Sequence, residues 1–282
     1  MFKYKDRPDL KESQLPHNRF ELFFDIIKNR IKFILANNLL LFAFSLPLFL
    51  GIIYISYEKA NYISTFIESD SFSFNSLFGY NLFLLGALII GLLILSVALS
   101  GLIEMIQEII FREGVVYSTD FIKGIKNNYV RLLISSILIS FSVFSFISSI
   151  DYMRYVDNSF VGISFLIISV ILILFSSIFS LFFIAQNLQY NVKMMDGIRN
   201  ALILFFAFFP RNILFFIATV VPIILVNYFG FISSVIYFLV LGFILYIPLI
   251  IASILYSNYI FDLSINKRIE GGIVRRGLSK DE

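Results

Sequence analysis

Few side chains in this chain could do chemistry, and their types already narrow what that chemistry could be. The sequence has one histidine, His17, and no cysteine, which excludes thiol nucleophiles, disulfides and thiolate metal sites. The acids beside apolar segments are Glu104, Glu108, Asp120 and Asp151, and no two of them form a recognisable catalytic pair. Phosphate-binding glycine loops, dinucleotide-binding glycine patterns, zinc-protease motifs and serine-hydrolase elbows are absent. We therefore expect no enzymatic activity, no cofactor and no metal.

Charged residues instead gather in two short stretches, STDFIKGIKNNYVRLL (118–133) and MMDGIRNALIL (194–204). Wound as a helix, the first stretch places its apolar side chains within an arc of about 120° and its polar ones opposite. The second stretch divides in the same way. This pattern is typical of amphipathic helices that lie in the membrane interface. The polar faces carry Asp120, Lys123, Lys126 and Asn127 in the first helix, and Asp196, Arg199 and Asn200 in the second.

The two stretches also resemble one another. A shift of 73 residues superposes Gly124-Ile125-Lys126-Asn127 on Gly197-Ile198-Arg199-Asn200. An internal duplication would explain this similarity. Two interpretations of the helices stay open at this point. They anchor the topology through their basic residues, or their seven polar residues dock a cytoplasmic partner.

The elements around these stretches are membrane spans. The 282-residue chain is 59% hydrophobic and 15% charged, with a mean hydropathy of +0.89, whereas soluble domains are about 45–50% apolar and about 25% charged. We predict an all-α polytopic protein with a cytoplasmic N-terminal tail (1–30, including an amphipathic segment), a six-helix membrane domain (31–256) and a cytoplasmic C-terminal tail (257–282). The fifth span could also start near Ala201 with a kink at Pro210. The six predicted spans are residues 33–55, 80–103, 132–150, 160–185, 213–228 and 231–256.

The distribution of basic residues predicts the orientation of these spans. All but two of the 22 Lys and Arg residues lie in the two tails or in the loops after the second and fourth spans, which places both termini in the cytoplasm. The exceptions, Lys59 and Arg154, fall in predicted outer loops at 58–79 and 151–159. No ionisable residue lies in the middle of a predicted span, which disfavours an ion-coupled transporter. Asn37, Asn38 and Asn227 are expected to hydrogen-bond between helices.

Four longer stretches together resemble the YesL-like family of bacterial integral membrane proteins, a domain of unknown function. The most recognisable are FREGVVYSTDFIKGIKNNYVRLL (111–133) and YNVKMMDGIRNALILFFAFFPRNILFF (190–216), and the other two are NNLLLFAFSLPLFL (37–50) and YIFDLSINKRIEGGIVRRGL (259–278). This chain departs from shorter members by an extra loop and span between Pro47 and Gly101. It also has Asn127-Asn128-Tyr129 where Asn-Trp or Asn-Phe is commoner.

The resemblance implies a small multi-pass protein of the bacterial cytoplasmic (inner) membrane. Because such proteins are often encoded beside carbohydrate uptake systems, it implies a non-enzymatic accessory protein of an oligosaccharide uptake system. The expected partners are the lipid bilayer and ABC transporter permease subunits, and the small net charge of +3 argues against nucleic acid. The alternative is a transporter or channel subunit that moves a small solute without ion coupling.

Overall fold

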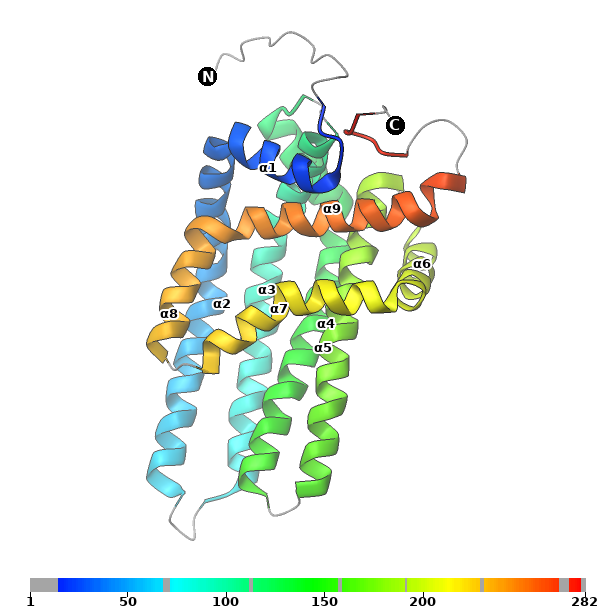
Figure 1. Cartoon of the computed structure of the whole chain (residues 1–282). Helices are drawn as coiled ribbons and strands as arrows, with labels where there is room; N and C mark the ends of the chain where they lie inside the picture. Colours follow the sequence, from blue (N-terminus) through cyan, green and yellow to red (C-terminus); the bar gives the residue numbers. More distant parts are fainter. Residues whose placement is uncertain are drawn as a thin grey trace.

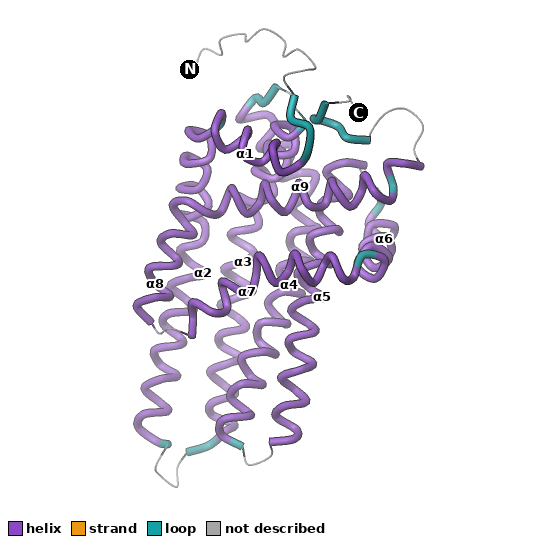
Figure 2. The backbone as a smooth tube through the Cα atoms, in the orientation of Figure 1, coloured by secondary structure: helices purple, strands orange, loops and turns teal. Residues whose placement is uncertain are grey.

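The structure is a computed structural model that describes residues 15–67, 72–111, 114–156, 159–190, 192–228, 231–268 and 274–279. Every regular element within these residues is helical (Figure 2). Residues 1–14 of the predicted N-terminal tail lie outside the described residues, as does the side chain of Asn227. The described residues hold five helices that are long and apolar enough to cross a membrane, or six if one bent pair counts as a span. The predicted all-α membrane fold is therefore confirmed.

Four long helices form the body of the molecule, as Figure 1 shows, and correspond to the first four predicted spans. Each has 32 to 39 residues, or about 48–58 Å at the usual rise of 1.5 Å per residue. They therefore exceed the roughly 30 Å hydrocarbon layer and continue beyond it at their ends. They are α2 (Ile31–Phe66), α3 (Phe74–Ile110), α4 (Tyr117–Tyr155) and α5 (Ser159–Tyr190).

Small residues and hydroxyl pairs hold these four helices together. A Cβ added to Gly91 of α3 would lie 2.5 Å from the Leu48 Cα of α2, so glycine is what allows these backbones to meet. Hydroxyl pairs join neighbouring helices, with Oγ···Oγ distances of 2.8 Å for Ser96–Ser136, 2.8 Å for Ser142–Ser176 and 3.0 Å for Ser149–Ser169. The outward faces carry large exposed apolar side chains, including Phe83, Ile90, Phe160 and Ile171. Because soluble proteins rarely expose apolar patches of this extent to water, we infer that the bilayer surrounds the bundle.

The charged stretch at 118–133 is helical as predicted, but it is not a separate interfacial helix. It forms the first part of α4 and continues without a break into the span. Its glycine explains why, since a Cβ at Gly124 would lie 2.6 Å from the Ser100 carbonyl oxygen of α3. The stretch therefore packs against the bundle rather than along a lipid surface. The second stretch does form a separate helix, α6 (Met194–Ala207).

The last third of the chain departs from the predicted pair of straight spans. After α6 come α7 (Phe209–Tyr228), α8 (Phe231–Val240), a π-helical turn (Leu241–Leu245) and α9 (Tyr246–Ser264). The axes of α6 and of α7 up to Thr219 differ by 92°. Pro210 accounts for the break, because it has no N–H with which to continue the helix. In Figure 1, α7 and α9 run across the four-helix bundle, whereas α8 runs alongside α2.

Each of the two helix breaks is held by one buried asparagine. Asn212 donates from Nδ2 to the Leu204 and Phe205 carbonyl oxygens, 3.2 and 2.9 Å away, at the end of α6. Asn38 of α2 donates to the Phe243 and Ile244 carbonyl oxygens and accepts from the Ile247 N–H at 2.8 Å. These bonds satisfy backbone groups that a break would otherwise leave unpaired. The predicted interhelical role of Asn38 is confirmed.

The first described residues and the last ones lie side by side at one end of the bundle, here called the terminal end; the opposite end is the distal end. The helix α1 (Arg19–Asn29) is capped by the preceding residue, Asn18, whose side chain accepts from the Glu21 N–H. Residues 274–279 run past it, and the Ser279 N–H donates to the Pro16 carbonyl at 3.0 Å.

We predict that Asn38→Leu lowers the free energy of unfolding by about 2 kcal/mol, because it leaves three backbone groups at the π-helical turn without their partner. The free energy would be measured by denaturant titration of the purified protein in mild detergent. Asn61→Leu is the matched control, since Asn61 lies on the same helix with an exposed side chain. Equal effects of the two variants would contradict the role assigned to Asn38.

Candidate functional site

A polar network at the terminal end joins three of the long helices. Lys123 Nζ of α4 lies 3.2 Å from Glu104 Oε1 and 3.1 Å from Glu108 Oε1, both on α3. Asn128 Nδ2 donates to Glu104 Oε2 at 2.9 Å, and Asn187 Nδ2 of α5 donates to Asn128 Oδ1 at 2.8 Å. Because the Lys123 side chain is 54% exposed, each ion pair is worth at most about 1 kcal/mol. The network sets the register of the helices more than it stabilises them.

Arg131 connects the two charged stretches. It is only 5% exposed, and its guanidinium donates to the Phe183 carbonyl at 3.2 Å and to the Val192 carbonyl. Its Cζ also lies 5.1 Å from the centre of the Phe183 ring. A Cβ at Gly197 would lie 2.7 Å from Arg131 Nη1. The glycine of the second stretch therefore makes room for the arginine of the first, and Arg131 fixes where α5 ends and α6 begins.

The five charged residues among the seven predicted docking residues divide into two groups. Asp120 and Lys123 serve the fold, because Asp120 accepts from the Val116 N–H at the start of α4 and Lys123 pairs with α3. The side chains of Lys126, Asp196 and Arg199 are exposed, and they have no hydrogen-bond or ion-pair partner within the part of the chain that the structure describes.

The two remaining docking residues are asparagines. Asn127 is exposed and its carbonyl oxygen accepts from Asn187 Nδ2 at 3.0 Å, whereas Asn200 is half-buried. The structure thus leaves three charges of the predicted set available to a partner.

Sequence reasoning missed a buried ion pair at the distal end. Lys59 Nζ of α2 lies 2.5 Å from Asp151 Oδ2 of α4 and 2.9 Å from Asn81 Oδ1 of α3. Asn81 Nδ2 also donates to Asp151 Oδ2 at 2.7 Å. Asp151 is 5% exposed and Asn81 is fully buried. Lys59 and Asp151 were expected in outer loops, but α2 and α4 remain helical past them. One signal was available, since Lys59 is one of the two basic residues that depart from the inside bias.

The spacing of the two polar layers matches a bilayer. Arg131 and Asp151 lie on one continuous helix, and their separation of twenty positions corresponds to about 30 Å. This is the usual thickness of the hydrocarbon core. Between them α4 carries no Asp, Glu, Lys, Arg or His. The two clusters therefore bracket an apolar slab at its two boundaries.

This arrangement limits the chemistry that the site can support. Among the described residues, no group of three His, Cys, Asp or Glu side chains comes together as a metal site. The ionisable groups of the two layers are paired within each layer and separated along α4 by the apolar slab. Proton relays need closely spaced ionisable groups through the membrane, and α4, α3 and α2 provide none between the layers. The geometry is that of a rigid bundle with a charged terminal surface.

We predict that Asp151→Ala lowers the free energy of unfolding by about 3 kcal/mol, because Lys59, whose side chain is only 15% exposed, would remain without its counter-charge. The double variant Lys59→Met/Asp151→Leu is expected to recover most of this loss, since it removes both charges. Unfolding in detergent measures each value. Arg154→Ala, one turn along α4 and exposed, should change stability by less than about 0.5 kcal/mol. A double variant no more stable than Asp151→Ala would contradict the pairing.

Comparison with known proteins adds no relative to this picture. No family model, no curated protein and no solved structure matches the chain. The site is therefore interpreted from its own residues. On that basis the chain is a polytopic membrane protein whose polar groups are concentrated at the two ends of a four-helix bundle.

Proposed function

We propose that this protein is a non-enzymatic accessory protein of the bacterial cytoplasmic membrane that docks another membrane component at its terminal end. The observation that carries the proposal is the set of three exposed charges without a described partner, Lys126, Asp196 and Arg199. They stand on α4 and α6, and the buried Arg131 holds the start of α6 against the bundle. Charges held on rigid elements favour specific recognition, because little side-chain and loop ordering is lost on binding.

The proposed partner is a permease subunit of a carbohydrate ABC importer. This part rests on the resemblance of residues 111–133 and 190–216 to YesL-like proteins. The charges of the predicted set are mixed, with two cations and one anion. Such a set suits a protein partner better than a uniform anionic lipid surface, which would favour a cluster of basic residues. Both termini would face the cytoplasm, in line with the bias of Lys and Arg toward this end.

A transporter or channel subunit is the second candidate, and the helix breaks favour it. Interrupted helices at membrane depth often line solute sites, and the described part of the chain has a sharp bend at Phe208 and a π-helical turn at Leu241–Leu245. Both breaks are closed internally by Asn212 and Asn38, which is why we place this function second. Solute uptake by proteoliposomes that contain the purified protein, compared with empty liposomes, distinguishes the two.

We predict that Lys126→Glu/Arg199→Glu reduces recovery of importer permease subunits at least fivefold, because it reverses both exposed cations of the predicted set. The measurement is quantitative mass spectrometry of proteins crosslinked in the membrane and co-purified in mild detergent. Arg154→Glu is the matched control, since it reverses an exposed cation near the distal end and should leave recovery unchanged. Wild-type recovery with the double variant, or no permease with the wild-type protein, would refute the docking role.

A further inference from the structure

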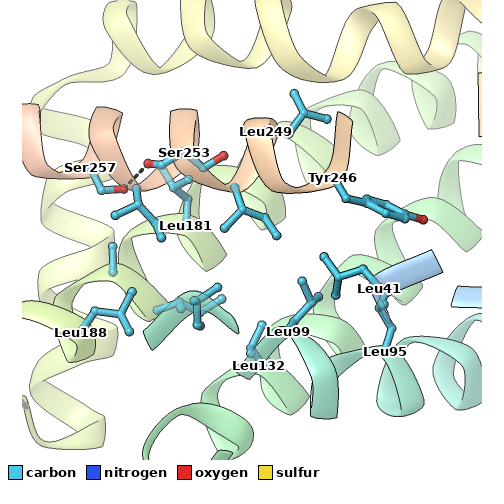
Figure 3. A pocket seen from close by; sticks show the side chains of 15 residues that line it. Leu41, Leu95, Leu99, Leu132, Leu181, Leu188, Tyr246, Leu249, Ser253 and Ser257 are labelled. Atoms are coloured by element: carbon cyan, nitrogen blue, oxygen red, sulfur yellow. Dashed lines mark hydrogen bonds between the residues drawn. The ribbon is translucent and has the colours of Figure 1, made fainter. Parts of the chain in front are cut away.

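A partly open apolar cavity of about 290 Å³ lies between α9 and the four-helix bundle. Figure 3 shows its walls, with Ser253 and Ser257 of α9 on one side and leucines of the bundle on the other. The lining side chains come from all four long helices and from α9. Nearly all of them are Leu or Ile; Tyr246 and the two serines are the residues with hydroxyl groups.

The cavity begins at the level of the terminal polar layer and extends into the apolar slab. Ile103 directly precedes Glu104 in α3, and Leu132 directly follows Arg131 in α4, so both lining residues lie at the boundary of the slab. From Ile103 back to Leu95 the lining follows α3 for about 12 Å toward the distal end. The cavity therefore reaches about 12 Å into the slab, a depth at which lipid chains lie in a bilayer.

Unpaired buried amides stand one helical turn beyond this cavity. Gln107 follows the lining residue Ile103 by four positions on α3, and Asn258 follows Ile254 by four on α9, so each shares the face of its helix with the cavity wall. Gln107 is 4% exposed and Asn258 is 1% exposed. Neither Nε2 nor Oε1 of Gln107, nor Nδ2 of Asn258, has a partner among the described residues. Buried amides are nearly always hydrogen-bonded, so these groups point to a missing polar ligand.

We propose that this cavity is a binding site for one acyl chain of a glycerophospholipid. The acyl chain fills the cavity beside α3 from the level of Leu95 to that of Ile103. The ester carbonyl and glycerol oxygens lie at the terminal boundary, where Gln107 and Asn258 supply donors. An unfilled apolar space forfeits the dispersion contacts of its lining, and lipid chains are the abundant apolar molecules at this depth. Because the unpaired groups are neutral amides, recognition is of the ester region rather than of headgroup charge.

Native mass spectrometry of the full-length protein in mild detergent, titrated with palmitoyl-oleoyl phosphatidylglycerol, tests the cavity. Ser253→Leu adds bulk inside it, and we expect about tenfold weaker retention, because two or more methylenes of the lipid would lose their place. Ala252→Leu is the matched control, since the neighbouring residue does not line the cavity and should retain lipid as the wild type does. Wild-type retention by Ser253→Leu, or equal loss in the control, would overturn the proposal.

A second arm tests the amides independently of the cavity. Wild-type protein should prefer diacyl phosphatidylglycerol over the dialkyl ether form with the same chains, because the ether lacks the carbonyl that the amides would bind. Gln107→Leu should remove this preference without preventing retention of either lipid. No preference in the wild type, or an undiminished one in Gln107→Leu, would overturn the assignment. So would displacement of phospholipid by equimolar palmitate, because a free fatty acid would then be the occupant.

Discussion

The need to satisfy every backbone N–H and C=O group inside the protein, where no water is available, governs this structure. The long helices α2 to α5 meet it through their own hydrogen bonds. The last third of the chain cannot do so alone, because it turns sharply at Phe208 and loosens into a π-helical turn at Leu241–Leu245. There the missing partners come from single asparagine side chains, Asn212 within the same segment and Asn38 from the distant helix α2. Both asparagines are fully buried, so the path of α6 to α9 depends on two amide groups.

The polar layers at the two ends match the long helices to a bilayer of fixed thickness. Each layer joins three helices at one level, through Lys59, Asn81 and Asp151 at the distal end and through Glu104, Asn128 and Asn187 at the terminal end. Side chains of this kind resist moving into hydrocarbon, so they fix the depth at which the bundle sits. The serine pairs between the layers join the helices without introducing charge. The charged layers at the two ends thus set the depth of the bundle in the membrane, and the serine pairs between them hold its helices together.

Hydropathy predicted the four long helices because an apolar run of about twenty residues has few alternatives to a membrane-spanning helix. It could not predict their extension past Lys59 and Asp151, because a hydropathy profile stops at the first charge whereas helical hydrogen bonds continue. The stretch at 118–133 was assigned to the interface because polar residues that face Glu104 and Asn187 on neighbouring helices look, in sequence, like residues that face water. Pro210 signalled a kink in the predicted fifth span, which the structure shows as the bend between α6 and α7, but not the angle of that bend. The link from Asn38 to α9 joins residues more than 200 positions apart, and no local pattern carries it. Lys126, Asp196 and Arg199 are exposed, as their polar face suggested.

The helix α9 links the features that could matter for function. It is attached to α2 at its start, through Asn38. Near its end Asp262 accepts from Arg19 Nη2 at 2.7 Å and from the Arg275 N–H at 3.2 Å, so it also joins α1 to the C-terminal segment. Between these two attachments it forms one wall of the apolar cavity. A lipid chain in the cavity would therefore press on the same helix that organises the terminal end.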